Sequence, residues 1–361
     1  MSKTRASSAL DSQKAEAFGG RLLSALNNGA FCLMASIGHR TELFDAMRDQ
    51  PSMASDEIAV RAGLNERYVR EWLGAMVTAG VVDVDPATLR FSLPPEHAAF
   101  LTRAAAADNI AVFAQYIALL GDVEGDIVEC FKHGGGVPYQ RFTRFHDGRR
   151  QRPVRLVVTR VAHPAACPGP DRATGSRNPD ARRRMRSGPN HNPARRAVSE
   201  QPLVGMDLSQ DAITAARNEA SVKGLENIEF VAIDLSDFHE KAESESFAFI
   251  ATFDAVHDQA APLNVLKGIR RALRGDGVYL MQDIKGSSHV HNNIVHPLGT
   301  FLYTVSCMHC MTVSLAQGGE GLGAMWGEEK TREYLERAGF RVVEKHELAH
   351  DIQNNWYVVR K

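Results

Sequence analysis

Long apolar runs and a regular cysteine pattern are both missing from this sequence of 361 residues. No apolar run reaches the roughly 18 residues that a membrane-spanning helix needs. The N-terminal stretch MSKTRASSALDSQKAE lacks the apolar core of a secretory signal. Five cysteines with irregular spacing do not build a disulfide framework. We therefore expect a cytoplasmic protein with reduced thiols and no membrane partner.

An excess of one charge sign is also missing, because the formal net charge is −1. A chain built mainly to coat nucleic acid would carry a large positive excess, so nucleic acid is not the expected partner. The length allows about two domains with a substantial core.

Residues 21–100 follow a tail of residues 1–20 and carry the pattern of a small helical domain that ends in a hairpin. Ser55 is suited to cap a short helix with Ile58 and Val60, which Gly63 ends. Asn65 is suited to cap a second helix, whose apolar stripe is Val69, Trp72, Leu73, Met76 and Val77. The segments GVVDVD and LRFSLP then flank the turn PAT as strands. Helix, turn, helix and hairpin is the order of a winged-helix domain.

Winged-helix domains often bind DNA, but the second helix mixes Arg67 and Arg70 with Glu66 and Glu71. A helix that reads DNA usually presents a basic face to the phosphates. The sequence therefore favours a dimerisation or lid domain, with a possible homodimer through this domain, over a DNA reader.

Residues 101–148 are predicted to be a helical connector that contains the tetrapeptide His133–Gly136. This HGGG sequence resembles the oxyanion-hole loop of lipases. Lipase chemistry also needs a nucleophile in a G-x-S-x-G turn, which the chain lacks. We interpret the glycines as a flexible turn, and pocket lining is the alternative.

Residues 149–202 differ from the sequence on both sides. They hold thirteen arginines, no lysine, eight prolines, three acids and no Phe, Trp or Tyr. Only VRLVV could form a strand, so we expect a disordered basic segment with little burial. A structureless loop of about 50 residues inside a domain argues against a genuine insert.

A one-base shift of the reading frame explains this segment. Permitted codons for Ala181–Pro189 are GCT CGA CGT CGG ATG CGG TCA GGG CCG, and reading one base later gives LDVGCGQG. Met185 has a single codon, which restricts the choice at that position. The recovered peptide is a strand that ends in an acid and a glycine-rich loop. A strand and loop of this kind belong about 20 residues before Asp207 in a nucleotide-binding sheet.

Residues 203–361 read as an α/β domain in which acids follow strands. LVGMD ends at Asp207, which suits hydrogen bonding to ribose hydroxyls, and Ser209 then caps a helix. IEFVAID ends at Asp234. The stretch FAFIATFDAVHDQ ends a third strand near Asp254 and His257. FRVVEKHEL and NNWYVVRK are predicted to form an antiparallel pair at the end of the sheet.

With the recovered loop, residues 180–361 resemble the class I S-adenosylmethionine-dependent methyltransferases. FKHGGGVPY, FDAVHDQ and YTVSCMHCMTVSLAQGGEGLGAMWG extend the resemblance to the members with an N-terminal winged-helix domain. The resemblance implies a doubly wound, Rossmann-like sheet, the cofactor S-adenosyl-L-methionine and a small-molecule methyl acceptor with an oxygen or nitrogen nucleophile. The written chain departs from the family because its glycine-rich cofactor loop is missing, which puts its activity in doubt.

The resemblance also implies roles for single residues. The expected cofactor-binding residues are Asp207, Leu208, Asp234, Leu235 and Asp254; Asp234 would accept the adenine amino group and the Leu235 N–H would donate. His257 is the candidate general base, because its ordinary pKa suits proton transfer near neutral pH. Methyl transfer that needs only alignment of the reactants is the alternative.

The cysteines of the CMHC motif, Cys307 and Cys310, raise the alternative of a zinc site. Structural zinc needs four ligands, and a second pair at suitable spacing is not evident, so no metal is expected. The run is better interpreted as a soft apolar pocket wall. The glycine-rich stretch AQGGEGLGAMWG is expected to be a mobile loop over the substrate or a plain surface loop. Two other functions stay open: a winged-helix transcriptional regulator that senses a ligand, and a catalytically dead scaffold.

Overall fold

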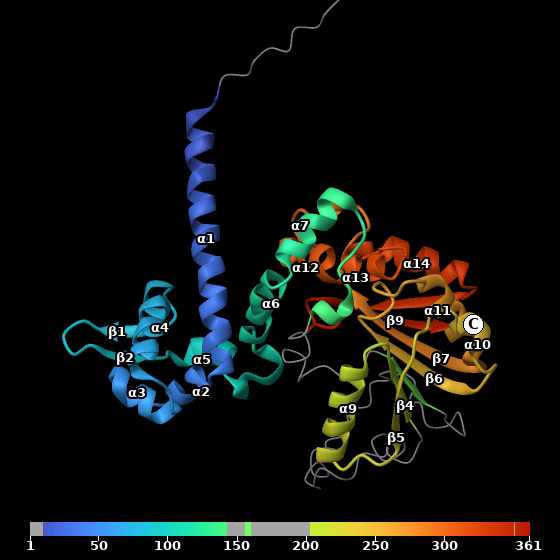
Figure 1. The fold of residues 1–361 in the computed structure, drawn as a ribbon, viewed down its shortest axis with the longest axis horizontal. Coiled ribbons are helices and arrows are strands. Elements are labelled where there is room, and N and C mark those ends of the chain that lie inside the picture. Colours follow the sequence, from blue (N-terminus) through green and yellow to red (C-terminus); the bar gives the residue numbers. More distant parts are fainter. Residues whose placement is uncertain (1–9, 143–155, 160–202, 350) are drawn as a thin grey trace, which may run out of the picture. The chain divides into compact units, whose positions relative to one another are not determined.

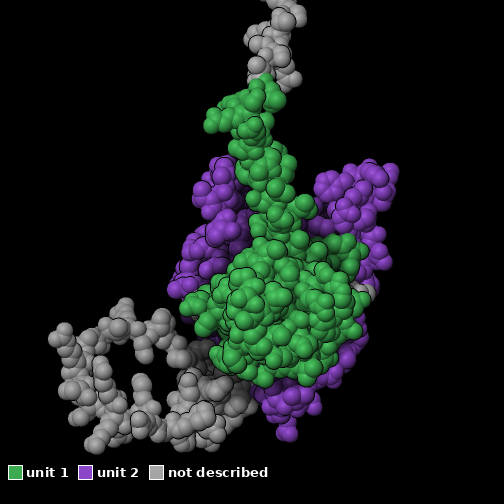
Figure 2. Space-filling model, turned by 90° about the vertical axis from the view of Figure 1, so that its left-hand side faces the viewer, with its two compact units in different colours: residues 1–122 green, residues 123–361 purple. Residues whose placement is uncertain are grey.

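The computed structural model describes residues 10–142, 156–159, 203–349 and 351–361. They divide into two compact units, residues 1–122 and residues 123–361 (Figure 2). The boundary falls inside the predicted connector, since helix α6 belongs to the first unit and helix α7 to the second. Within the described residues, no helix is long and apolar enough to cross a membrane.

The first unit contains the winged helix that the sequence predicts. Its helices and hairpin are α1 (Ser12–Arg40), α2 (Leu43–Met47), α3 (Ser55–Ala62), α4 (Glu66–Thr78), β1 (Asp83–Asp85), β2 (Arg90–Ser92), α5 (Pro95–Leu101), the 3-10 helix η1 (Arg103–Asp108) and α6 (Ala111–Gly121). Strands β1 and β2 pair antiparallel as the wing. The Asn65 side chain accepts a hydrogen bond from the Arg67 N–H at 3.0 Å, which caps α4 as predicted.

Two details of α3 differ from the sequence prediction. The N-cap is Ala54, and the Ser55 hydroxyl instead donates to Glu66 at 2.6 Å. Val60 is 83% exposed whereas Ile58 is buried. Residues two apart on a helix point in nearly opposite directions, so both could not face the core. In the core of the first unit, the ring of Phe44 packs edge to face against the ring of Trp72, with 5.2 Å between the ring centroids.

Helix α1 of the first unit is only partly packed. Its last turns contribute Ala35 to the core of the unit, and the Trp72 indole donates to the Met34 carbonyl at 2.9 Å. Its first turns stand away from the rounded body of the unit as a free column (Figures 1 and 2). Phe18, Leu22 and Leu26 on this column are 56–70% exposed.

The second unit is built on a seven-stranded sheet with the order β5-β4-β3-β6-β7-β9-β8. The strands are β3 (Leu156–Thr159), β4 (Leu203–Asp207), β5 (Ile228–Ala232), β6 (Phe247–Phe253), β7 (Leu273–Ile284), β8 (Val342–His346) and β9 (Asn354–Arg360). Strand β4 is parallel to β5, and β6 is parallel to β7. Strand β9 is antiparallel to β7 and β8, which confirms the predicted C-terminal pair.

Helices connect and flank these strands. They are α7 (Glu124–His133), η2 (Tyr139–Arg141), α9 (Gln210–Val222), α10 (Phe238–Lys241), α11 (Pro262–Ala272), η6 (Val290–Asn293), α12 (Gly299–Val305), the π-helical turn η7 (Ser306–Cys310), α13 (Met311–Ala316), η8 (Ala324–Trp326) and α14 (Gly327–Arg337). Figure 1 shows α9 beside β4 and β5, and α11 and α14 beside β6, β7 and β9.

The strand register shows that helices cover both faces of the sheet. Ile213 of α9 packs against Phe230 of β5, and the pairing through β4, β3 and β6 puts Phe230 on the face opposite Tyr279. Tyr279 instead packs with buried side chains of α11 and α14, such as Leu266 and Leu335. Burial of each such leucine stabilises the fold by about 1.5–3 kcal/mol. The unit is therefore doubly wound, as predicted.

Strand β3 is one part of residues 149–202 that the structure describes. It lies in the centre of the sheet, antiparallel to both β4 and β6. The sequence allowed a strand in this segment only at VRLVV, and β3 at Leu156–Thr159 overlaps that stretch, whose valines favour strand pairing. The remainder of the predicted disordered segment lies outside the described residues.

Candidate functional site

The carboxyl ends of β4 and β6 meet at one edge of the sheet, because both strands run antiparallel to β3 between them. Asp207 is the last residue of β4, and Asp254 follows the last residue of β6. Open α/β sheets bind ligands at this edge, where the strand order reverses. The structure thus brings the predicted strand-end acids to the edge where a nucleotide-like cofactor is expected.

A small cavity lies at this edge within the second unit. Its volume is about 40 Å³. Four parts of the chain supply its main polar side chains: Asp207 at the end of β4, Asp258 and Gln259 after β6, Tyr139 of η2, and Gln317 after α13. Its apolar wall is formed by Met206, Leu208, Ile233, Leu235, Ala255, Val256, Val265 and Val313.

Asp207 faces this cavity with its carboxylate held in place. The side chain is buried, and Oδ1 accepts a hydrogen bond from the Ser209 N–H at 2.8 Å. Ser209 is the residue that caps α9, since its hydroxyl oxygen accepts from the Ala212 N–H at 3.2 Å. Because Ser209 fulfils the capping role, the carboxylate of Asp207 is placed to receive further donors from the cavity side.

The other predicted cofactor residues divide into two groups. Leu208 and Leu235 line the cavity, whereas Asp234 and Asp254 do not. Asp234 is exposed, and its Oδ1 accepts hydrogen bonds from the Ser236 hydroxyl at 2.6 Å and the Ser236 N–H at 2.8 Å. These hydrogen bonds lower the pKa of Asp234, with the hydroxyl as the larger cause. Asp254 has a positive φ of 47° and turns the chain after β6.

His257 is buried at the same edge and is paired with a carboxylate. Its exposed fraction is 2%, and its Nδ1 lies 2.7 Å from Oδ1 of Asp283. Asp283 is fully buried and lies one residue before the end of β7. The same Oδ1 accepts from the Ile284 N–H at 2.8 Å and from the Trp326 indole N–H at 3.2 Å.

The charge of Asp283 controls the protonation of His257. Burial by itself would lower the pKa of His257, because an imidazolium loses its hydration. Burial is the largest single influence, but the charge of Asp283, the interaction with Cys310 and the hydrogen bonds to both groups together outweigh it and raise the pKa of His257 well above its usual range. The pair therefore holds a proton on the imidazole at neutral pH in this arrangement.

His257, the candidate base, directly precedes two residues that line the cavity but does not line it. Asp258 and Gln259 line the cavity, whereas His257 does not. Nδ1 of His257 is bound to Asp283, and the ring also makes a hydrogen bond with Cys310, so an acceptor would have to compete with Cys310 for the imidazole. Asp258 is buried and is a second acidic group at the same loop.

Sequence reasoning missed Asp283, Tyr139, Gln317 and the role of Trp326. One signal for Asp283 was available, since it is a lone acid that ends the apolar run VYLMQD in the same way that Asp207 ends LVGMD. Tyr139 lies far along the chain from Val313 and Gln317, and no local pattern marks it as their neighbour.

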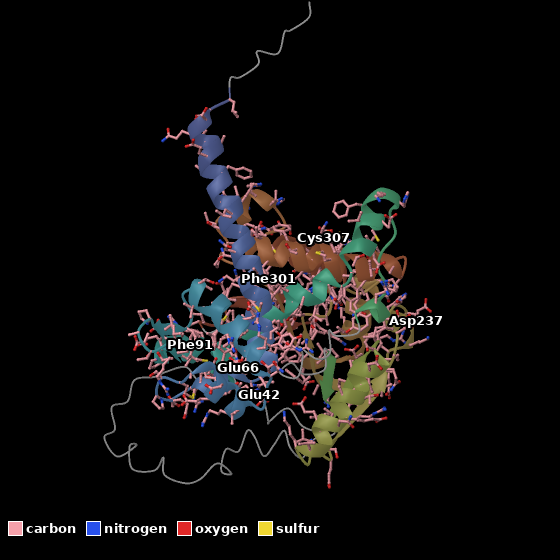
Figure 3. All side chains as sticks on the ribbon, turned by 60° about the vertical axis from the view of Figure 1, so that its left-hand side comes forward. Glu42, Glu66, Phe91, Asp237, Phe301 and Cys307 are labelled. Carbon is pink, nitrogen blue, oxygen red and sulfur yellow. The ribbon has the colours of Figure 1, made fainter. Side chains whose placement is uncertain are left out.

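The structure also places the HGGG tetrapeptide and the CMHC motif. Gly134 and Gly135 line a second, open cavity of about 610 Å³, so pocket lining, the alternative interpretation of HGGG, describes them. The CMHC residues lie on the π-helical turn η7, on which Figure 3 labels Cys307. His309 is fully buried between the rings of Tyr139 and Phe142, at 5.9 and 4.7 Å.

The stretch AQGGEGLGAMWG is packed rather than loop-like at its end. Ala324, Met325 and Trp326 are buried, and the following Gly327 lies against the backbone of Ser287 and Ser288. The expectation of a mobile or plain surface loop is therefore wrong for this part, because close packing against a neighbouring backbone leaves no free volume for movement.

The residue types at the edge suit S-adenosylmethionine, but the enclosed volume does not. An acid at the end of β4 and apolar side chains around Leu235 are appropriate for a ribose and an adenine. Pockets for ligands of that size enclose about 300–1,000 Å³. The cavity of about 40 Å³ has room for only a few water molecules, so the described residues form part of a cofactor site and not the whole of it.

Comparisons with known proteins agree with this fold. Residues 29–103 match the Rv2258c-like winged HTH domain, and residues 191–339 match a methyltransferase domain. No curated protein matches the chain.

Solved structures resemble the whole chain at low identity. Human N-acetylserotonin methyltransferase in complex with S-adenosylmethionine is 14% identical, with 99% of each chain covered and a TM-score of 0.60. The mitomycin 7-O-methyltransferase MmcR is 14% identical over 97% of this chain and 100% of its own, with a TM-score of 0.58. An O-methyltransferase family protein from Burkholderia thailandensis is 15% identical over 94% and 97%, with a TM-score of 0.57.

At these identities the solved structures show the shared fold, and the two domain matches carry the assignment. The winged HTH match lies in the first unit, and the methyltransferase match covers β4 to β7 in the sheet of the second unit. The chain therefore belongs to the S-adenosylmethionine-dependent methyltransferases that carry an N-terminal winged-helix domain.

Proposed function

We propose that this protein transfers a methyl group to an oxygen or nitrogen atom of a small molecule. The observation that carries the proposal is the methyltransferase match over residues 191–339 combined with Asp207 and Asp258 in one cavity at the carboxyl edge of the sheet. The names of the similar structures include O-methyltransferases, which supports an oxygen nucleophile as the first choice.

His257 is the proposed general base. Asp283 binds Nδ1 and so fixes the ring and its tautomer, which leaves Nε2 as the nitrogen that accepts a proton. An acceptor at the cavity would lose its proton to Nε2 as it becomes methylated. The raised pKa of His257 means that the neutral, proton-accepting form gains population as pH rises, so the rate should increase with pH.

Asp258 is a competing candidate, because it lines the cavity and His257 does not. A carboxylate at this position could accept the proton directly or bind the acceptor. If neither group acts, catalysis rests on alignment of the reactants alone.

A matched pair of variants separates these possibilities. His257→Ala should lower the maximal rate by roughly 10²–10⁴-fold and abolish the rise of rate with pH, with cofactor affinity nearly unchanged. Asp258→Asn is the matched comparison, since it keeps the size of the side chain and removes its charge and its capacity to accept a proton. If only Asp258→Asn lowers the rate, His257 is a packing residue and Asp258 carries the proton transfer.

The described structure supports the proposal that the written chain binds its cofactor weakly. A parallel strand and a glycine-rich loop at the sheet centre would bring backbone N–H groups to the cofactor. Antiparallel β3 occupies that place, and the cavity beside it is only about 40 Å³. Resequencing of codons 145–205 tests the shifted frame directly, and codons that exclude the LDVGCGQG reading would refute it.

The winged helix is proposed to act in self-association and not in DNA reading. Arg67 and Arg70 of α4 are each paired with an acid of the same helix, Glu71 at 2.5 Å and Glu66 at 2.6 Å (Figure 3 labels Glu66). Paired arginines have less charge to offer to phosphates. A DNA affinity that falls steeply with salt would instead support the regulator alternative.

The free part of α1 supports a homodimer through this unit. Phe18, Leu22 and Leu26 repeat every four residues and form one exposed apolar stripe. An isolated helical segment of this length is only marginally stable in water, so burial against a second copy would stabilise it. Leu22→Asp with Leu26→Asp should give a monomer in analytical ultracentrifugation. Leu89→Asp, at an equally exposed leucine in the wing, is the control.

A further inference from the structure

Trp326 connects a segment outside the cavity to the His257–Asp283 pair. Its indole N–H donates to Oδ1 of Asp283 at 3.2 Å, and His257 Nδ1 lies 2.7 Å from the same oxygen. Within the described residues, Oδ2 of Asp283 has no hydrogen-bond partner. The hydrogen bonds of this carboxylate in the described structure therefore converge on one oxygen, where the indole and the imidazole compete for the same negative charge.

Contacts of both the side chain and the backbone fix the position of Trp326. The side chain is 4% exposed and meets the ring of Tyr334 edge to face at 5.7 Å. Its carbonyl accepts a short hydrogen bond from the Ser288 hydroxyl. Tyr334 therefore packs against the indole ring of Trp326, and Ser288 binds its backbone.

Two glycines bracket the short helix η8 that carries Trp326. Gly323 and Gly327 have positive φ angles of 72° and 76°. A Cβ at Gly323 would lie 2.3 Å from the Ser306 hydroxyl oxygen, and one at Gly327 would lie 2.1 Å from the Ser288 backbone nitrogen. At both positions any other residue would have an unfavourable backbone conformation and a steric clash. The backbone on either side of Trp326 is therefore held in one conformation.

We propose that Trp326 is a positioning residue for His257, acting through the carboxylate of Asp283 that both side chains share. The indole N–H fixes the orientation of the carboxylate, and it draws charge away from the imidazole so that the ring releases its proton more readily. The proposal deepens the proposed function, since it rests on His257 as the base for its catalytic meaning, but the geometry can be tested without activity.

The proposal predicts the direction in which the pKa of His257 changes when the indole N–H is removed. Loss of the indole donor leaves more of the negative charge on Oδ1 for the imidazolium, so His257 should hold its proton to a higher pH. Other titratable groups near the pair are Asp258, the residue after His257, and Cys310 of η7, which interacts with His257. Tyr279 of β7 and Tyr357 of β9 also lie near it, and Asp283 helps to raise their pKa values. None of these is changed by a substitution at Trp326.

The experiment follows the ring of His257 by NMR in the full chain with isotope-labelled histidine, and His257→Gln identifies the signal. Trp326→Phe removes the N–H and keeps an aromatic ring; it should move the titration midpoint of His257 upward by about 0.5–1 pH unit. Trp356→Phe is the matched control, because the Trp356 indole donates to a different carboxylate, Asp351, at 3.0 Å. The control should leave the midpoint within about 0.2 unit of the wild type.

Each outcome decides the matter. An unchanged midpoint in folded Trp326→Phe, or an equal shift in Trp356→Phe, overturns the proposal. If Trp326→Phe does not fold, replacement of tryptophan by its benzothiophene analogue, which keeps the two-ring shape without the N–H, should produce the same shift. A midpoint shift that the pH profile of methyl transfer does not follow supports the positioning of His257 and refutes its role as base, so the two failures are distinguishable.

Discussion

Asp283→Asn should reverse the way in which stability depends on pH. In the wild type the pKa of His257 is raised in the folded state above its unfolded value of about 6.5. The stabilisation from the pair is therefore fully present below about pH 6.5 and is lost as pH rises through the folded-state pKa. Within that window, the free energy of unfolding should fall by up to about 1.4 kcal/mol per pH unit from this one histidine.

Substitution by asparagine removes the charge and keeps the shape of the side chain. Burial, the largest influence on His257, is then opposed only by Cys310, so we expect the pKa of His257 to fall below its unfolded value and stability to be lost as pH falls below about 6.5. At pH 6 the variant should also be less stable by about 3 kcal/mol, because the buried ion pair between His257 and Asp283 that stabilises the wild type is lost.

The measurement is urea unfolding between pH 6 and pH 9. In a Trp72→Phe background the fluorescence reports the second unit, since Trp326 and Trp356 are the other two tryptophans. Asp351→Asn is the control, because it removes a carboxylate that binds the indole of Trp356. Parallel pH curves for wild type and Asp283→Asn would refute the reasoning about the pair.

Three other predictions concern the cofactor and the backbone. Calorimetry should show that a frame-restored protein binds S-adenosylmethionine at least about tenfold more tightly than the written chain, and equal affinities would show that the loop is dispensable. In the frame-restored protein Asp207→Ala should weaken cofactor binding about five- to tenfold, whereas Asp234→Ala, outside the cavity, should have less effect. Gly327→Ala should lower the free energy of unfolding by about 3 kcal/mol, and Gly275→Ala, with open space around it, should change it little.

Periodicity and capping residues were sufficient for the winged helix. The stripe of α4 and its Asn65 cap are local features, and local features are visible in a sequence because they depend on spacing of three or four residues. The failure at Val60 has the same origin, since an apolar residue at the wrong angle of a helix cannot reach the core.

The strand-end acids were also predictable, but only in part. Asp207 and the α9 cap at Ser209 were read from one continuous segment. Whether an acid faces a cavity depends on the turn after the strand, and Asp234 is held outside by hydrogen bonds to Ser236. The sequence alone determined which strands end in acids, and the turns decided which acid faces the site.

The partners of His257 were decided by tertiary structure. Asp283 and Trp326 lie 26 and 69 residues after it, and a β-strand and a glycine-bracketed turn bring them together at one oxygen. The central place of β3 is a second case, because an antiparallel strand between β4 and β6 follows from pairing with both neighbours. Such contacts depend on which segments meet in space, and no pattern along the chain encodes that meeting.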